Sequence, residues 1–150
     1  LIGESWMKVM AVGVFDLLHA GHLHYLEQAK ALGTHLTVVV AHDDTVRIRK
    51  HEPVTNHGLR KRMVEGLKPV DSVIIGNSPD VSIYDILKVV NPDIIALGYD
   101  QEHAEDSIRQ KLQDLGLGMI TVTRVEGLSD DLDGTRKIIA RILELSRKDE

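Results

Sequence analysis

The sequence contains no cysteine, few aromatic residues and no long apolar run. The lack of thiols excludes a disulfide scaffold, a thiolate metal site and a cysteine nucleophile. No apolar stretch approaches the ~20 residues that cross a bilayer, and the net charge of −5 disfavours a broad duplex-DNA footprint, which needs a basic face. No basic segment leads into an apolar one near the start, so we expect no signal peptide. These absences predict a soluble cytoplasmic protein with neither a nucleic-acid partner nor a membrane partner.

The length and the apolar content are those of one folded domain. The chain has 150 residues, and a domain of that size buries roughly 68–70% of its unfolded surface. Patterned sequence begins at Met7. We therefore expect a single domain over residues 7–150, and we interpret residues 1–6 as an addition from cloning.

Short apolar runs alternate with helical patterns along the whole chain. Strands are predicted at 8–14, 36–41, 72–76, 93–98 and 119–124, and helices at 22–32, 59–67, 82–90, 102–115 and 135–146, with a polar loop over 42–56. The strand runs are continuously apolar, which is typical of strands buried on both faces. The pattern predicts an α/β fold, a Rossmann-like doubly wound five-stranded parallel sheet with helices on both faces. Ligands of such sheets bind beyond the carboxyl ends of the strands.

The segment after the first strand holds the clearest chemical signal. Residues 13–22 read GVFDLLHAGH and place His19 and His22 at the start of a helix with Gly21 between them. A helix N-terminus favours an anion, and two imidazoles there can point at one phosphate. The alternatives are two surface histidines at a turn, or a metal-dependent hydrolase that uses Asp16, His19 and His22 as zinc ligands.

GVFDLLHAGH resembles the first signature of the HxGH nucleotidyltransferases, the cytidylyltransferase-like superfamily. The similarity extends from about Val9 to Leu145, and it is nearest to archaeal FAD synthases and to glycerol-3-phosphate cytidylyltransferases. The resemblance implies an enzyme that transfers a nucleotidyl group from a nucleoside triphosphate to a phosphorylated acceptor and releases pyrophosphate. His19 and His22 would then be catalytic, because they would donate hydrogen bonds to the α-phosphate oxygens.

The same resemblance implies where the nucleotide is bound. Lys50 is the nearest match to a loop lysine that closes over the β- and γ-phosphates, and Arg60 matches a family arginine. Thr135 keeps the hydroxyl with which the last helix of the family opens. The nucleotide contacts predicted in this way come from Val14, Phe15, Ala20, Gly21, Lys50, Arg60, Asp100, Arg124 and Thr135.

The motifs do not agree on the acceptor. GYDQ at residues 98–101 and LDGTRKI at residues 132–138 resemble the archaeal flavin enzymes, whereas RVEGLS at residues 124–129 resembles the cytidylyltransferases. The first expectation is therefore adenylyl transfer from ATP to FMN, with Tyr99 and Gln101 binding the acceptor. The alternatives are cytidylyl transfer from CTP to glycerol-3-phosphate and a non-catalytic nucleotide-binding module.

An isoalloxazine ring needs a flat apolar or aromatic wall, and the chain has few residues to build one. Of its aromatic side chains, only Phe15 and Tyr99 follow strands directly, so these two are predicted to form the wall, whereas Tyr25 and Tyr84 are not. We expect no protein-held metal, because no acidic cage is evident; Mg²⁺ would arrive on the triphosphate. The resemblance further implies a homodimer.

Overall fold

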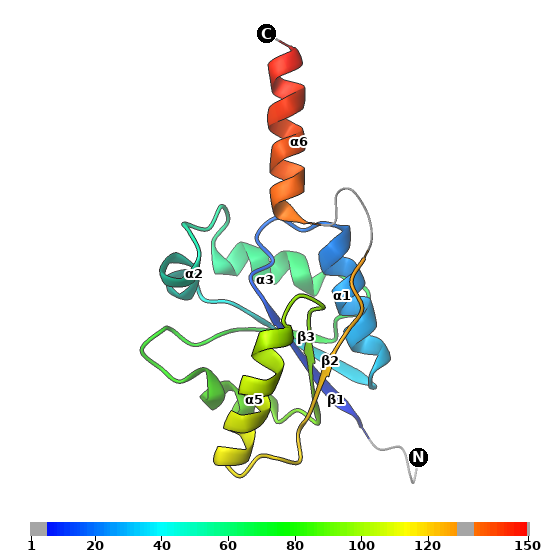
Figure 1. Cartoon of the computed structure of the whole chain (residues 1–150), viewed down its shortest axis with the longest axis vertical. Coiled ribbons are helices and arrows are strands. Elements are labelled where there is room, and N and C mark those ends of the chain that lie inside the picture. Colours follow the sequence, from blue (N-terminus) through cyan, green and yellow to red (C-terminus); the bar gives the residue numbers. More distant parts are fainter. Residues whose placement is uncertain (1–5, 129–133, 150) are drawn as a thin grey trace.

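The computed structural model describes residues 6–128 and 134–149. Within them, β1 (Lys8–Gly13), β2 (His35–Val40), β3 (Ser72–Ile75), β4 (Ile94–Leu97) and β5 (Thr121–Arg124) form one sheet in the order β3-β2-β1-β4-β5. Every neighbouring pair is parallel, with Gly13 opposite Val40 and Val9 opposite Ile94. The chain winds outward in both directions from β1, so the predicted doubly wound parallel sheet is confirmed (Figure 1).

Helices cover both faces of this sheet, as its apolar strands require. On one face, Leu26 and Ala29 of α1 (Ala20–Ala31) and Val64 of α3 (His57–Glu65) pack against buried residues of β1 and β2. On the other face, α4 (Ile86–Val90) and α5 (Glu102–Asp114) pack against alternate residues of the same strands, such as Met10. The two faces therefore have separate apolar cores.

Two predictions about local structure were wrong. The segment expected to be a loop over 42–56 contains α2 (Asp43–Arg49), which buries only Val46 and therefore carries almost no apolar periodicity. His42 caps it, and Asp43 and Asp44 in its first turn favour the helix dipole. The helix expected over 82–90 is instead the 3₁₀ turn η1 (Ile83–Asp85) followed by α4.

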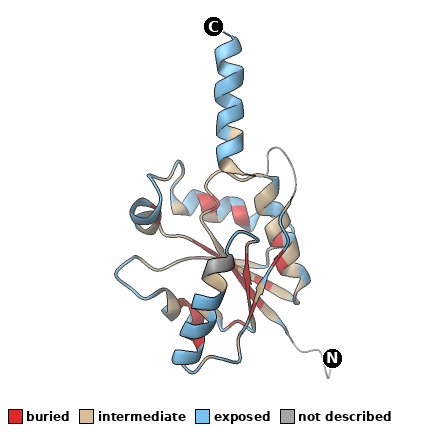
Figure 2. Ribbon diagram, in the orientation of Figure 1, coloured by how far each residue is buried: buried red, intermediate tan, exposed pale blue. Residues whose placement is uncertain are grey.

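The last helix, α6 (Thr135–Lys148), begins where the sequence predicts but stands clear of the rest of the chain (Figure 1). None of its residues is buried, and Figure 2 shows it almost entirely exposed. No helix among the described residues has the length and apolarity to cross a membrane.

Candidate active site

His19 ends the loop after β1 and caps α1. Its backbone is extended, and its Nδ1 accepts hydrogen bonds from the N–H groups of Gly21 at 3.1 Å and His22 at 3.4 Å. The first N–H groups of a helix lack partners within the helix, so an acceptor at this position stabilises α1. Because Nδ1 accepts, the neutral ring carries its proton on Nε2. The same side chain thus fixes the start of the helix and has its N–H donor on Nε2.

His22 stacks on His19 one turn into the helix. Their ring centroids lie 3.8 Å apart with the planes 22° from parallel, and the ring of Phe15 packs against His22 at 5.2 Å. Burial is the largest cause, and together with the nearby charges of His19 and Lys50 it lowers the pKa of His22 to about 4. Its Nδ1 is buried without a hydrogen-bond partner among the described residues. His22 is therefore a neutral imidazole with unused hydrogen-bonding capacity.

Phe15 packs against His22 from within the core and does not form a wall for a ligand. It is 2% exposed and has a left-handed backbone with φ 55°, a conformation that is strained for a bulky residue. A Cβ on Gly13 would lie 2.7 Å from the Phe15 ring, so only glycine fits there. The prediction that Phe15 lines the acceptor site was wrong because its ring turns inward and fills the core.

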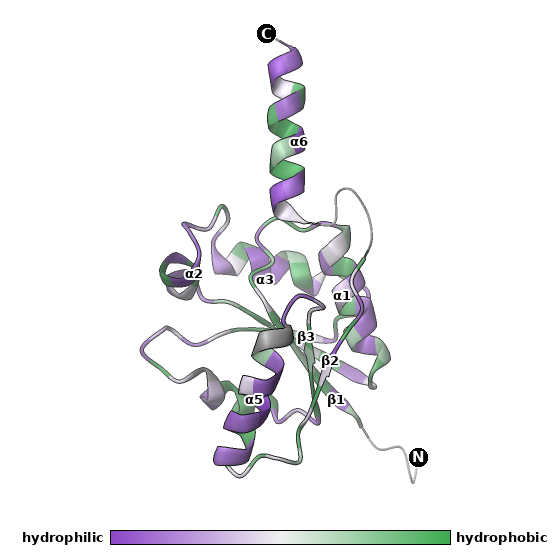
Figure 3. Ribbon diagram, in the orientation of Figure 1, coloured by the Kyte–Doolittle hydropathy of each residue, from purple (hydrophilic) through white to green (hydrophobic). Residues whose placement is uncertain are grey.

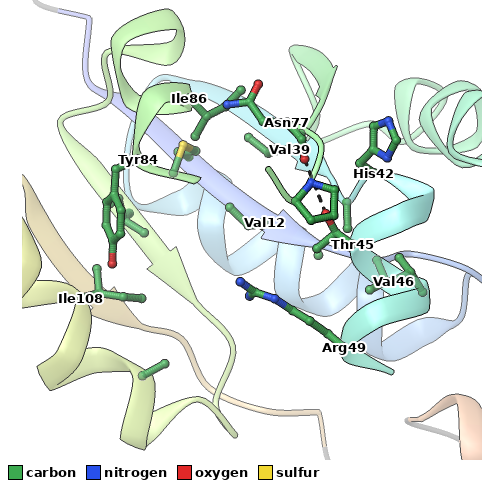
Figure 4. A pocket seen from close by; sticks show the side chains of 18 of the residues that line it. Val12, Val39, His42, Thr45, Val46, Arg49, Asn77, Tyr84, Ile86 and Ile108 are labelled. Atoms are coloured by element: carbon green, nitrogen blue, oxygen red, sulfur yellow. Dashed lines mark hydrogen bonds between the residues drawn. The ribbon is translucent and has the colours of Figure 1, made fainter. Parts of the chain in front are cut away.

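Beside the histidine loop, a cavity of about 700 Å³ opens on the face of the sheet that carries α4 and α5. Gly13 and Val14, which begin the histidine segment, line one end of it. Its other walls come from α2, from the loop after β3 and from α5, and Figure 4 shows Tyr84 and Ile108 across from Val46 and His42. Most of the lining is aliphatic, including Met10, Val12, Val39, Ile86, Ile95 and Ile108.

The aromatic side chains of this cavity are Tyr25 and Tyr84, the two that the sequence reasoning set aside. Tyr99 is 57% exposed, and its ring packs so closely on Gly127 that a Cβ there would lie 2.6 Å from it. Tyr99 is not among the residues that line the cavity. The aromatic lining of the cavity is thus Tyr25 and Tyr84, and the acceptor role of Tyr99 stays a prediction. A signal for Tyr84 was available, since the segment that carries it follows the carboxyl end of β3.

Tyr25 lies at the switch point between β1 and β4. Its hydroxyl donates to the carbonyl oxygen of Ala96 at 2.6 Å and accepts from the N–H of Val12 at 3.4 Å. Burial raises the pKa of Tyr25, and the charge of Asp100 raises it further, so the phenol stays neutral. The ring is therefore a fixed part of the cavity wall. Asp100 follows β4, and its Oδ1 lies 3.1 Å from where a Cβ on Gly98 would be.

The cations after β2 divide into two groups. Arg47 turns away from the cavity, because its Nε donates to Glu52 at 2.9 Å and its Nη1 to Asp44 at 2.7 Å. Arg49 and Lys50 both line the cavity. Lys50 follows the last residue of α2, and its charge contributes to the lowered pKa of His22. Its predicted contact with the β- and γ-phosphates stays a prediction.

Arg60 lies on α3 and is only 1% exposed. Its Nε donates to the carbonyl of Thr55 at 2.9 Å, its Nη1 to the carbonyl of Val14 at 2.7 Å and its Nη2 to Asp43 at 2.6 Å. Burial pushes the pKa of Asp43 up, but the hydrogen bonds from Arg60 and His57 and the charges of both residues together hold that pKa below its usual value. Arg60 thus braces the histidine loop against α2, and its predicted phosphate contact stays a prediction.

The remaining predicted residues lie around the carboxyl ends of β4 and β5. Gln101 lines the cavity, and its Oε1 accepts from the N–H of Gly98 at 3.0 Å. Arg124 donates from Nε to Glu105 at 2.8 Å and from Nη1 to the Tyr99 carbonyl at 3.3 Å. Thr135 opens α6 behind Gly134, while the motif residues Ser129, Leu132 and Asp133 lie outside the described residues.

The hydrolase alternative loses Asp16 as a ligand. The Asp16 carboxylate accepts from the N–H groups of Val54 at 2.7 Å and Thr55 at 2.8 Å, and from the Thr55 hydroxyl at 2.8 Å. Burial pushes the pKa of Asp16 up, but these hydrogen bonds hold it below its usual value. Asp16 ties the histidine loop to the segment before α3. In the described parts of the chain, no group of three histidine, aspartate or glutamate side chains is placed to hold a metal ion.

A family model described as cytidylyltransferase-like matches residues 10–132, which include both histidines, Lys50, Arg60 and Arg124. The chain belongs to the cytidylyltransferase-like family. An FAD synthase of Aciduliprofundum boonei is 46% identical over 139 residues, which cover 92% of this chain and 91% of the relative. An FAD synthase of Thermococcus onnurineus is 43% identical over 139 residues, 92% of each chain.

Solved structures of the cytidylyltransferase-like family and of its wider fold agree with this sheet. A protein from Thermoplasma volcanium, described as a lipopolysaccharide core biosynthesis protein, has a TM-score of 0.77 and 38% identity, and the match covers 83% of this chain and all of that one. Pantothenate synthetase from Thermus thermophilus has a TM-score of 0.61 at 16% identity, covering 93% of this chain and 66% of that one, which is a likeness of fold alone.

Proposed function

We propose that the protein is an FMN adenylyltransferase, a nucleotidyltransferase that forms FAD and pyrophosphate from ATP and FMN. A phosphate oxygen of FMN attacks the α-phosphorus of ATP, and the bond from that phosphorus to the pyrophosphate oxygen breaks. The nucleophile is already anionic near neutral pH, so the step needs positioning and charge stabilisation more than a base. The FAD synthases that are 46% and 43% identical to this chain support the assignment.

The observation that carries the proposal is the apolar cavity beside the histidine pair. A ring system as wide as isoalloxazine needs an apolar pocket with a few polar groups, and a cavity of about 700 Å³ with Tyr25 and Tyr84 in its walls has that character. Glycerol-3-phosphate is small and polar, so its binding would leave most of these aliphatic side chains unused. The pocket therefore favours the flavin over the alternative acceptor.

The histidines take the catalytic role in this mechanism. Neutral His22 and the Nε2 of His19 donate to the non-bridging oxygens of the α-phosphate as charge develops there. Lys50, whose charge already acts on His22, neutralises the departing pyrophosphate. Mg²⁺ would arrive bound to the triphosphate and would neutralise part of its charge.

A pyrophosphate-release assay that crosses ATP and CTP with FMN, glycerol-3-phosphate and phosphopantetheine tests the assignment. Release with ATP and FMN, together with FAD identified as the product, is the expected result. Release with CTP and glycerol-3-phosphate, and none with FMN, would replace the flavin assignment by the glycerol-3-phosphate alternative. We propose a cytoplasmic location and a domain over residues 7–150 as parts of the same assignment.

We further propose that the enzyme is a homodimer in which α6 packs on a second copy. The helix exposes Ile139, Ile142, Leu143 and Leu145. Figure 3 shows α6 with hydrophobic segments, in green, between hydrophilic ones, in purple. It carries five cationic residues and one acidic residue, whereas the whole chain is acidic with a net charge of −5. Another copy of the chain therefore offers an acidic surface to a basic amphipathic helix.

Light scattering distinguishes a dimer from a monomer of 16.7 kDa. Ile142→Glu places a charge on the apolar side of α6 and is expected to give monomers. Ala140→Glu makes the same change of charge on the other side of the helix, about 160° away at 100° per residue, and is expected to leave the dimer intact. Equal masses for the two variants would contradict the role of α6.

A further inference from the structure

Arg49, the last residue of α2, enters the cavity without a partner. Figure 4 shows its guanidinium reaching from the end of α2 toward β1, below Val12. Other arginines form ion pairs: Arg47 pairs with Glu52, and Arg124 pairs with Glu105. Within residues 6–128 and 134–149, the Arg49 side chain makes no hydrogen bond and no ion pair. An unpaired guanidinium that lines a cavity is available to pair with a bound anion.

The shape of the guanidinium indicates which chemical group it binds. A guanidinium presents parallel N–H donors in a plane, which match two oxygens of a phosphate better than a single carbonyl of a base or a sugar hydroxyl. Arg49 is exposed, so its charge is maintained by water until a ligand arrives. A phosphate that reaches the cavity would therefore exchange water for a paired, directional contact.

Two phosphate groups must meet in this enzyme, and the chain provides two neighbouring cations. Lys50 lines the cavity, and its charge contributes to the lowered pKa of His22 at the start of α1. Arg49 precedes it by one residue, at the end of α2, and lines the same cavity, whose walls include Tyr84. In the proposed reaction the lysine serves the nucleotide and the arginine serves the acceptor.

We propose that Arg49 binds the 5′-phosphate of the flavin and thereby distinguishes FMN from unphosphorylated riboflavin. The inference rests on the proposed FMN adenylyltransferase activity. Arg49 would act as a specificity-determining residue, because it holds the phosphate beside the transfer centre while the ring occupies the apolar cavity. Riboflavin presents the same ring and lacks only the group that Arg49 recognises.

Flavin fluorescence titrations with FMN and with riboflavin, without nucleotide, test this role. The wild-type protein is expected to bind FMN more tightly than riboflavin, by about tenfold or more. Arg49→Gln should lower the FMN affinity to that of riboflavin and leave riboflavin binding within twofold. The readout is the ratio of the two affinities, which a general disturbance of the cavity would not change selectively.

Arg47→Gln is the matched control, because it removes the same group from the same helix at a position that faces away from the cavity. It should keep the wild-type ratio. Arg49→Lys should recover part of the ratio, since it restores the charge without the planar fork. The inference is overturned if Arg49→Gln keeps the ratio and weakens ATP binding instead, or if the wild-type protein binds both flavins equally. An enzyme that does not convert FMN to FAD fails the proposed function itself.

Discussion

The imidazole rings of His19 and His22 stack with their centroids 3.8 Å apart, and the Nδ1 of His19 accepts the backbone N–H of His22. The first ring therefore fixes the position of the second through the backbone as well as through ring contact. Both rings are held before any ligand binds, and such preorganised donors stabilise charge that develops in a transition state.

Removing either imidazole should slow catalysis far more than it weakens nucleotide binding. We expect His22→Ala to lower kcat by about a hundredfold or more, since a lost donor of this kind costs ~2.7–4 kcal/mol in the transition state. His19→Ala should have a similar effect on kcat and should also destabilise α1 by about 1 kcal/mol, because it removes the cap. Steady-state kinetics with an ATP-binding titration measures both quantities.

His19→Asn separates the two roles of His19, because asparagine caps helices well but offers no ring nitrogen. It should restore the stability that His19→Ala loses and leave kcat low. A variant without both imidazoles that turned over at the parental rate would falsify the mechanism.

The buried His22 should make the protein less stable in mild acid. Its pKa is about 4 in the folded state and 6.5 for the free side chain, so between these values the unfolded chain binds more protons. The free energy of unfolding should therefore be highest above pH 6.5 and fall as the pH decreases toward 4. The expected loss at pH 5 is about 1–2 kcal/mol.

Urea unfolding at pH 7 and pH 5 measures this loss. His22→Gln lacks the titrating group and should lose less stability than the wild-type protein over the same interval. An equal loss in the two proteins would mean that other groups govern the acid sensitivity.

Arg60 and Asp43 form a buried pair that should matter more for stability than for catalysis. Arg60→Met leaves Asp43 with an uncompensated charge and frees the Val14 carbonyl, and breaking a buried pair in this way costs about 3–5 kcal/mol. Arg62→Met is the matched control, because Arg62 is exposed on the same helix. Urea midpoints should fall for Arg60→Met and stay near the wild-type value for Arg62→Met.

If Arg60 also bound phosphate, a milder variant should reveal it. Arg60→Lys keeps the charge but cannot reach the carbonyls of Thr55 and Val14 together with Asp43. A KM for ATP that rises with little loss of stability would show a phosphate role in addition to the brace.

The sheet was predictable because its central strands are short apolar runs buried on two faces. Val38 to Val40 are all at most 3% exposed, and such a run has few alternatives to a central parallel strand. The His19 and His22 pair was predictable for a related reason, since a local motif after a strand is placed by the strand itself. The sequence therefore predicts the positions of the two histidines in the fold.

The acceptor side was not predictable in the same way. Arg49 and Tyr84 come from segments that the sequence divides into a loop and a regular helix, and the structure replaces these with α2 and with the η1 turn. Whether an aromatic ring lines a cavity or fills a core depends on long-range packing. The Phe15 ring packs against Gly13 only because glycine has no Cβ, and no local sequence pattern predicts that the ring points inward.

Tyr84 gives the sharpest comparison between the sequence and the structure. It lines the cavity from the η1 turn, and the Nζ of Lys111 lies 5.8 Å from its ring centre, a contact that helps to orient the ring. Tyr84→Ala removes an aromatic wall, and aromatic pairs contribute ~0.5–1.5 kcal/mol beyond their buried area. We therefore expect the KM for FMN to rise about tenfold and the KM for ATP to change less than twofold.

Tyr99→Ala is the rival variant, because the sequence pattern places Tyr99 on the acceptor and the structure leaves its ring 57% exposed over Gly127. It should change the KM for FMN little, whereas Tyr84→Phe, which keeps the ring, should remain close to the wild-type value. Measuring both KM values for the three variants decides between the two walls. A larger effect of Tyr99→Ala than of Tyr84→Ala on FMN would mean that the flavin lies at the GYDQ edge of the sheet, outside the cavity, and that Tyr84 serves only to pack α4 and α5 together.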